Sequence, residues 1–361
     1  MKLYFMEMRK ICEKKILWVG LGAMFLFFFF QFWVTNIGDY RIYDNGNVYT
    51  GIDAIKRDQE IAGEYEGALT FEKAEQIIDR YGFSYFNDMD YETGNFCSRF
   101  ITHMTTHLMQ NGEKPTEFAK NKDGGYMGEE WMDGSLSFGY TQGWENLTEG
   151  MILYVTGVCL LLIIAVSPVF CEEYMLGTAD IAYTTKHGRG KDIWMKIAAA
   201  LGVSILLYTM VVGGMYLAYF CLYGRDGLSA SAAWLFYSIT ADRNKTVLSF
   251  FMEYFITGLI GVLLNTCMTL FISSLCRQNF FSVILSVICY LAPVGVGNVV
   301  LSMFPVTKVT MILRNICLWF PIYLSHILQF NRIAFLEIWR ICVITGLFCV
   351  SIVGAYRVYR K

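Results

Sequence analysis

Two histidines have the spacing of a known catalytic motif. The segment HMTTH places His103 and His107 one helical turn apart, as the HExxH motif of zinc peptidases does. That motif needs a glutamate after the first histidine to activate water, and this chain has Met104 there. A zinc site also needs a third ligand, which the sequence does not identify. We therefore predict no metal site, and expect both histidines to pack at the edge of a helical stripe that includes Phe96 and Phe100.

A second run, GRGKD at 188–192, resembles the end of a phosphate-binding loop. Such a loop needs a glycine five residues before its second glycine, and a serine or threonine after its lysine. This chain has Thr185 and Asp192 at those positions, and its sequence contains no other candidate loop. We therefore predict no catalytic residues, no cofactor bound by this chain and no ATP hydrolysis by this chain alone.

The composition indicates a membrane protein rather than an ordinary soluble domain. Of 361 residues, 55% are hydrophobic and only 17% are charged. A helix of about 20 apolar residues crosses the hydrocarbon core of a bilayer. Uncharged runs close to that length occur at six places, namely 16–36, 151–170, 197–222, 254–275, 280–304 and 341–356.

Basic residues near these runs predict the orientation, because Lys and Arg in short flanks stay on the cytoplasmic side. They gather in the amino-terminal flank, in the connection after the second span, at Arg277 and in the carboxyl-terminal tail. We expect a multi-pass protein of the cell membrane with both termini in the cytoplasm. Residues 1–15 have an apolar stripe at helical spacing, so we expect a helix that lies at the cytoplasmic interface. The run 16–36 is too long for a signal peptide and should stay as an anchor.

The segment before the last span leaves two interpretations open. Residues 309–328 are apolar enough for a seventh span, but Arg314 and Pro321 interrupt them. A seventh crossing would also place the basic carboxyl terminus outside the cell. We favour a reentrant-like outer segment at 305–337. The LAPVGVG run at 291–297 is expected to bend or weaken the fifth span.

Residues 37–150 form one large hydrophilic insertion, which we expect to be an extracellular α+β domain. It contains 21 Asp and Glu but 9 Lys and Arg, a net charge of −12. Thr70 as N-cap and Gly82 as stop predict a helix over 71–81, and a second helix is expected over 96–110. The remaining Gly-rich stretch predicts loops and short strands. Because Cys97 is its single cysteine, it has no internal disulfide, which is typical of a bacterial membrane protein.

Polar residues within the spans are candidates for a translocation path, because they usually face protein or a cavity. They are Gln31, Asn265, Thr266 and Asn298. The alternative for each is a hydrogen bond between neighbouring helices.

The connection at 171–193, between the second and third spans, carries more charge than orientation requires. Glu172 and Glu173 follow the apolar run directly, and Lys186, Arg189 and Lys191 precede the third span. Acids at the start of a helix and bases at its end suit the helix dipole. We expect a short helix on the cytoplasmic surface that presents a polar face to a partner protein.

This connection resembles that of the type-2 ABC transporter permeases. The matching residues are Glu173, Gly177, Thr178, Thr185, Lys186, Gly188, Arg189 and Lys196. The expected architecture is also similar along nearly the whole chain. The resemblance implies the permease subunit of an ABC exporter, an all-α polytopic membrane protein with six transmembrane helices in 1–36 and 151–361. Such a subunit would pair with a second permease, identical or different, and with a separate ATPase subunit that holds ATP and Mg²⁺.

The resemblance also implies which residues couple the chain to that ATPase. They are Glu172, Glu173, Gly177, Thr178, Lys186, Arg189, Lys191 and Lys196. Membrane lipid is the other expected partner, and nucleic acid is not expected. The main alternative is a membrane receptor or sensor whose extracellular domain binds a ligand, and a membrane peptidase is a third interpretation that depends on the two histidines.

Overall fold

The computed structural model of the chain is mostly helical. It describes residues 2–44, 46–86, 91–106, 114–121, 124–184, 190–236, 245–300, 303–305, 307–317, 320–324 and 334–360. Six helices in these ranges are long and apolar enough to cross a membrane, namely Lys15–Gly38, Gln142–Met175, Lys191–Tyr223, Val247–Leu275, Asn279–Gly297 and Cys342–Arg360. They overlap all six spans predicted from the sequence. The prediction of a helical, multi-pass membrane protein is therefore confirmed.

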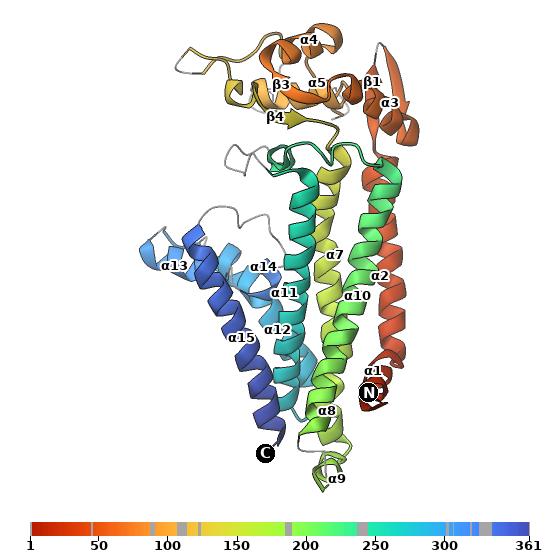
Figure 1. The fold of residues 1–361 in the computed structure, drawn as a ribbon, viewed down its shortest axis with the longest axis vertical. Helices are drawn as coiled ribbons and strands as arrows, with labels where there is room; N and C mark the ends of the chain where they lie inside the picture. The colour runs from red at the N-terminus through yellow and green to blue at the C-terminus, as the bar shows by residue number, and fades with distance from the viewer. Residues whose placement is uncertain are drawn as a thin grey trace. The chain divides into compact units, whose positions relative to one another are not determined.

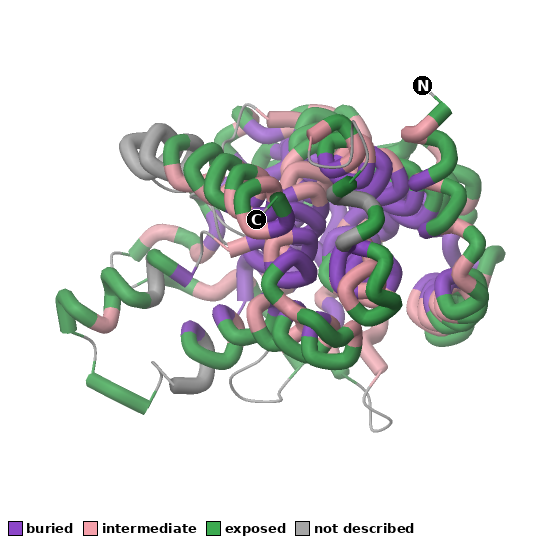
Figure 2. Tube along the Cα trace, turned by 90° about the horizontal axis from the view of Figure 1, so that it is seen from below, coloured by how far each residue is buried: buried purple, intermediate pink, exposed green. Residues whose placement is uncertain are grey.

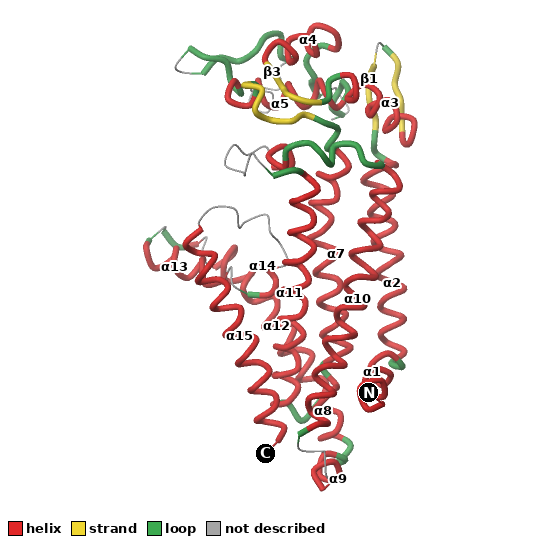
Figure 3. The backbone as a smooth tube through the Cα atoms, viewed as in Figure 1, coloured by secondary structure: helices red, strands yellow, loops and turns green. Residues whose placement is uncertain are grey.

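The chain divides into two compact units. The helical unit comprises Met1–Phe27, Met151–Met215 and Glu253–Lys361, and the α/β unit comprises Phe28–Gly150 and Tyr216–Met252. Strands occur in the α/β unit among the described residues (Figure 3). In the view along the helices, buried residues face the packed interior of the helical unit and exposed residues cover its outer faces (Figure 2). Many of those exposed residues are large and apolar, as lipid contact requires.

Helices supply every regular element of the helical unit in the described ranges (Figure 1). The first ones are α1 (Lys2–Cys12), α2 (Lys15–Trp33), α7 (Gln142–Val166), α8 (Pro168–Met175), α9 (Ala179–Thr184) and α10 (Lys191–Tyr223). The later ones are α11 (Val247–Leu275), α12 (Asn279–Val294), α13 (Lys308–Cys317), α14 (Pro321–Leu324) and α15 (Ala334–Arg360). A π-helical turn, Val34–Gly38, follows α2.

A proline separates α7 from α8 and redirects the second span. Pro168 has no amide N–H, and its ring crowds the preceding helical turn. Ser273 of α11 compensates for the lost backbone bonding. Its hydroxyl donates to the Ser167 carbonyl at 2.5 Å and accepts from the amides of Phe170 and Cys171 at 3.1 and 3.3 Å. Because unpaired backbone groups are costly in apolar surroundings, α11 holds the direction in which α8 leaves α7.

The fifth span changes its helical form where the sequence predicted a weak point. Pro293 lies inside α12, and a π-helical segment, Gly295–Val300, follows it. The predicted span 280–304 is thus α-helical only to Val294. In the region where a seventh span was considered, the described residues form the two short helices α13 and α14, and the residues between 325 and 333 lie outside the described part.

A close helix approach positions α15 against α11. A Cβ atom on Gly354 would lie 2.6 Å from the Phe271 ring, nearer than packed carbon atoms come. Glycine therefore allows α15 to lie directly on α11. The same helix ends one turn and a half later at Tyr359 and Arg360, beside the ends of other spans.

The α/β unit contains two small antiparallel sheets with helices packed on them. Strand β1 (Arg41–Asp44) pairs with β2 (Asn47–Thr50), and β3 (Gly67–Thr70) pairs with β4 (Asp133–Phe138). The helices are α3 (Gly51–Glu64), α4 (Phe71–Tyr81) and α5 (Phe96–Thr105), with a 3₁₀ turn at Glu129–Trp131. An α+β architecture was predicted for this insertion.

The two helices predicted in the insertion have different outcomes. Helix α4 has the predicted bounds: Thr70 accepts the Lys73 amide as N-cap, and Gly82 follows with φ of +73°. The prediction of a helix over 96–110 was too long, because α5 ends at Thr105 and Thr106 is extended. Thr102 and Thr105 bond their hydroxyls to carbonyls one turn back, a competing local bond that weakens a helix end.

A buried acid organises the core of the α/β unit. Asp58 on α3 is completely buried and accepts bonds from the Tyr40 hydroxyl, the Phe96 amide at 2.8 Å and the Arg99 guanidinium at 3.3 Å. The Tyr40 hydroxyl also lies 2.9 Å from that of Tyr140. Burial raises the pKa of Asp58, although Arg99 and the hydrogen bonds oppose the rise. This network joins α3 and α5 to Tyr40, the residue before β1.

Candidate functional site

Gly177 and Thr178, two of the residues that carry the resemblance, follow the end of helix α8. Gly177 has φ of +67°, the left-handed region that glycine adopts without steric cost. Its amide donates to the Tyr174 carbonyl at 3.3 Å, and the Thr178 amide donates to the Glu173 carbonyl at 3.0 Å. These two bonds form a Schellman motif, which satisfies carbonyls at a helix end. Gly177 and Thr178 therefore end α8 and lead the chain into α9.

Lys196 is the centre of a buried charge cluster at the ends of the spans. Its side chain is 1% exposed, and Nζ lies 2.7 and 2.6 Å from Oε1 and Oε2 of Glu173. Nζ also lies 2.7 Å from Oδ2 of Asp192, one turn earlier on α10. An ammonium group has three donors, and these two carboxylates accept them. Lys196 thereby ties α8 to α10.

Tyr359 adds α15 to the same cluster. It is completely buried, and its hydroxyl donates to Oε2 of Glu173. Its ring centroid lies 4.7 Å from that of Phe170 and 5.2 Å from the Lys196 ammonium. A neutral donor suits Glu173, because that carboxylate shares its cation with a second acid. Three helices, α8, α10 and α15, thus meet at one carboxylate.

A second ion pair joins the turn between α1 and α2 to α8. Lys14 Nζ lies 3.2 Å from Glu172 Oε2, with side-chain exposures of 21% and 44%. A cavity of about 400 Å³ lies beside this pair, and Glu7, Lys10 and Thr178 also line it. Glu7 is buried and bonded to Lys10 at 2.5 Å. Helices α1 and α8 therefore share a polar cavity.

The predicted coupling residues are divided between the interior and the surface. Glu173 and Lys196 bind each other inside, and Glu172 pairs with Lys14. Gly177, Thr178 and Lys191 are exposed, whereas Lys186 and Arg189 lie outside the described residues. Lys196 thus binds acids of its own chain rather than facing outward.

Large apolar side chains are exposed beside this polar cluster. Met175, Leu176 and Ile181 are 57%, 64% and 67% exposed on α8, its end and α9. Two of them, Leu176 and Ile181, lie beyond the last residue of the candidate span, Met175. Contiguous exposed apolar patches mark contact surfaces with protein or membrane.

Sequence reasoning missed three members of the cluster: Lys14, Asp192 and Tyr359. Asp192 carries a detectable signal, since it stands four residues before Lys196 on one helix face. Tyr359 has none, because 186 residues separate it from Glu173. Such a contact arises only when α15 packs.

The candidates for a translocation path have local partners where their side chains are described. Asn265 donates to the Cys159 carbonyl of α7 at 3.3 Å, and Thr266 lies 2.7 Å from the Ser204 hydroxyl of α10. Both are bonds between helices, the alternative expected for polar residues in spans. Gln31 donates to Thr35 at 3.2 Å within its own helix. The Asn298 side chain lies outside the described part.

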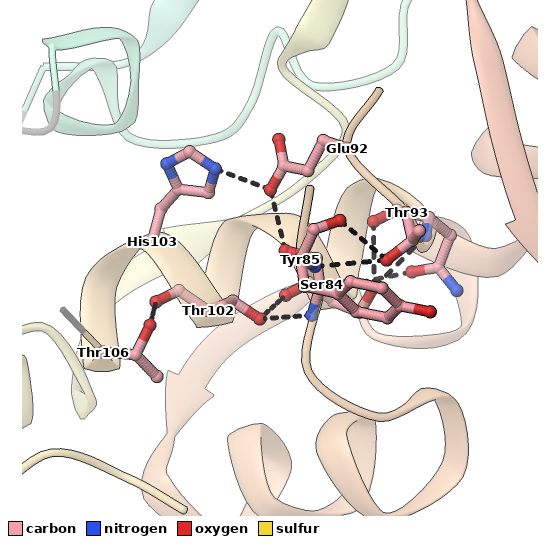
Figure 4. Close-up of polar contacts among 9 residues, drawn as sticks. Ser84, Tyr85, Glu92, Thr93, Thr102, His103 and Thr106 are labelled. Atoms are coloured by element: carbon pink, nitrogen blue, oxygen red, sulfur yellow. Dashed lines mark hydrogen bonds and ion pairs between the residues drawn. The ribbon is translucent and has the colours of Figure 1, made fainter. Parts of the chain in front are cut away.

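His103 belongs to a hydrogen-bonded group in the α/β unit (Figure 4). Its Nε2 lies 2.7 Å from Glu92 Oε1, and the Ser84 hydroxyl donates to that same oxygen at 2.7 Å. A nucleophilic serine would instead bond to the histidine, which takes its proton. Ser84 is also completely buried. These bonds therefore connect Glu92 to α5. They do not place the Ser84 hydroxyl for nucleophilic attack.

The charge on Glu92 is stabilised by this arrangement. Burial alone would raise its pKa, but the hydrogen bond and charge of His103 outweigh burial and hold the pKa of Glu92 below its ordinary value. The second histidine of the HMTTH run, His107, lies outside the described residues.

Among the residues that the structure describes, no group of three or more His, Cys, Asp or Glu side chains could hold a metal ion. Comparison of the chain with family models, curated proteins and solved structures gave no match in any of the three.

Proposed function

We propose that this chain is the membrane permease subunit of an ATP-driven exporter of the type-2 ABC class. The proposal combines six candidate spans with the resemblance of the 171–193 connection. A separate ATPase subunit would supply the energy, and a second permease subunit would complete the pathway. In this proposal the protein lies in the cell membrane, with both termini and the 171–193 connection in the cytoplasm.

One observation carries this proposal furthest: Glu173, at the start of the 171–193 connection, is bound by two other helices, and apolar side chains that follow it are exposed. Glu173 is bound by Lys196 of α10 and by Tyr359 of α15. Leu176 and Ile181 remain exposed beyond the end of the span. A contact that transmits force needs an apolar surface that binds the partner and a firm link to the spans, because a flexible loop would absorb the displacement.

The arrangement suggests how motion would pass into the spans. A partner that closes around ATP would move the end of α8 and α9 through contacts with Leu176 and Ile181. The displacement would reach α10 and α15 through the carboxylate of Glu173, and these helices contribute two of the six spans. ATP binding would then bias two arrangements of the spans through differential contacts. Lys196 and Tyr359 act as positioning residues in this mechanism.

The test uses the full chain copurified in lipid with a soluble ATPase encoded beside it, one that contains GxxxxGK[ST]. We expect the permease to stimulate ATP hydrolysis by that partner. Leu176→Asp and Ile181→Asp should weaken the ATPase association about tenfold, as loss of a central apolar anchor does. Ile52→Asp is the matched control, because Ile52 is 46% exposed in the α/β unit.

The proposal fails if the purified chain neither binds nor stimulates that ATPase. It also fails in its coupling assignment if Leu176→Asp, Ile181→Asp and Ile52→Asp behave alike. Glu173→Ala should lower stimulated ATPase activity while the chain still inserts in the membrane, and Arg189→Glu should do the same.

A receptor or sensor is the second candidate, and one observation favours it. A cavity of about 290 Å³ in the α/β unit is lined by Arg80, Lys114 and Tyr85, although the 37–150 insertion is strongly acidic. Lys114 Nζ lies 4.7 Å from the centre of the Tyr85 ring. A small anion would suit this lining. A receptor would bind such an anion without any effect on the neighbouring ATPase.

A further inference from the structure

A second cavity lies at the ends of three candidate spans of the helical unit. Its volume is about 740 Å³, and it opens beside the start of α2, the end of α8 and the start of α12. Its walls are mostly apolar and include Ile16, Ile164 and Val283. Since Lys15, Met175 and Asn279 are the terminal residues of these spans, the cavity lies at the level of a membrane interface.

The kink at Pro168 contributes to this cavity. Pro168 lines it, at the point where α8 leaves the direction of α7. Helix α8 then packs against α12, and Cys171 lies 3.8 Å from the Asn279 side chain. Residues of α7, α8 and α12 thus line the crevice together with Lys14 and Ile16 at the start of α2.

Opposite charges lie together at this crevice. Lys14 and Glu172 both line it and form the 3.2 Å ion pair. An ammonium group has three donors and a carboxylate accepts several bonds, so each can bind a further group. Both side chains keep part of their surface exposed, at 21% and 44%. The crevice thus offers one cation and one anion above an apolar floor.

Asn279 and the first turn of α12 add donors on the opposite side. Asn279 lines the crevice at the first position of this 16-residue helix. The N-cap residue, Gln278, makes no side-chain capping bond within the described part of the chain. Amide groups at a helix N-terminus favour a phosphate. These donors supplement Lys14 at the same opening.

We propose that this crevice binds a membrane phospholipid whose headgroup carries both a phosphate and a primary ammonium. The phosphate lies between Lys14 and Asn279, the ammonium donates to Glu172, and acyl carbons fill the space against Ile164 and Val283. A quaternary ammonium lacks N–H donors for Glu172, and an uncharged alcohol headgroup lacks the cation. The proposal needs only the membrane location and does not depend on an ATPase partner.

Such a lipid would also contact the candidate coupling site. Lys14 and Glu172 line the 400 Å³ cavity beside α1 as well as this crevice. Glu172 precedes Glu173, which holds α10 and α15. Occupancy of the crevice therefore changes the environment of the Lys14–Glu172 pair, which lines both cavities.

The experiment measures lipid retention by the delipidated full chain in detergent, by native mass spectrometry. Phosphatidylethanolamine, phosphatidylcholine and phosphatidylglycerol of identical acyl chains are the three probes. We expect phosphatidylethanolamine to be retained best and to raise the apparent Tm most. Lys14→Gln should lower its retention about fivefold, because the phosphate loses its bond to the ammonium group. Val283→Trp should reduce retention of all three lipids by filling the floor.

Two controls keep the outcome decisive. Lys2→Gln removes an exposed lysine of α1 that does not line the crevice and should leave retention unchanged. Glu172→Gln should abolish the preference for phosphatidylethanolamine over phosphatidylcholine while total binding persists. Equal retention of the three lipids by the unaltered chain overturns the headgroup assignment. Unchanged retention in both Lys14→Gln and Val283→Trp overturns the site.

Discussion

The hydroxyl of Tyr359 on α15 donates a hydrogen bond to the carboxylate of Glu173 on α8. The two residues are 186 positions apart, and Lys196 of α10 binds the same carboxylate. Glu173 therefore binds groups of two other helices, the neutral hydroxyl of Tyr359 and the ammonium of Lys196. The bond from Tyr359 can be removed alone, because phenylalanine keeps the ring that packs on Phe170.

Tyr359→Phe should destabilise the helical unit by about 1.5–3 kcal/mol, the range for a hydrogen bond to a charged group. The measurement is the apparent stability of the purified chain in detergent. The effect should shrink when Glu173→Gln is already present, because the charged acceptor is then gone. Tyr356→Phe is the control on the same helix, since the Tyr356 hydroxyl contacts only exposed Arg360 among its described bonds. Equal losses in Tyr359→Phe and Tyr356→Phe would contradict a special role for the Glu173 bond.

Lys196→Met should have a larger effect than Tyr359→Phe. It leaves the carboxylates of Glu173 and Asp192 without their shared cation, and breaking a buried pair costs about 3–5 kcal/mol. Adding Glu173→Leu and Asp192→Leu should recover part of the loss, because the orphaned charges are then removed. Thermal unfolding of the single and triple variants checks this. A triple variant less stable than Lys196→Met alone would show that the charges themselves do not cause the loss.

The spans could be predicted from the sequence because one physical requirement determines them. A run of about 20 uncharged residues has few alternatives to a membrane helix. Helix α4 was predictable for a local reason too, since Thr70 and Gly82 mark its two ends within one short segment. The end of α5 was predicted too late, because local threonine bonds and the extended Thr106 compete with helix continuation.

The candidate site could be predicted only in part. Glu173 and Gly177 were singled out through the resemblance of the 171–193 connection, and the structure gives a physical reason for the glycine, its positive φ. The ion pairs of Lys196 were not predicted, because the resemblance implied a coupling residue, whereas packing buries this side chain between two acids. Lys14 and Tyr359 join the site through contacts between distant segments, which no local spacing encodes.

Gly177→Ala should loosen the end of α8. Alanine at φ of +67° is strained by roughly 1–2 kcal/mol, although an added Cβ would meet no atom within 4 Å. We expect faster amide exchange at Leu176–Thr178, which hydrogen–deuterium exchange measures. Gly190→Ala is the matched control, because Gly190 has equally open space without a positive φ. Unchanged exchange in Gly177→Ala, or the same change in Gly190→Ala, would contradict the Schellman stop.

Glu92→Gln should remove a stabilisation of the α/β unit that depends on pH. The pKa of Glu92 is lowered in the folded chain, so its contribution is complete above the pKa of an unfolded glutamate, about 4.3. That contribution is lost as pH falls through the lower folded pKa, because the protonated carboxyl no longer attracts His103. The difference in apparent Tm between the unaltered chain and Glu92→Gln should thus be fully present above the unfolded pKa and shrink as pH falls further. Glu75→Gln, at an exposed position on α4, should show no such pH dependence. A difference that stays constant down to acid pH would mean that Glu92 acts by packing and not by charge.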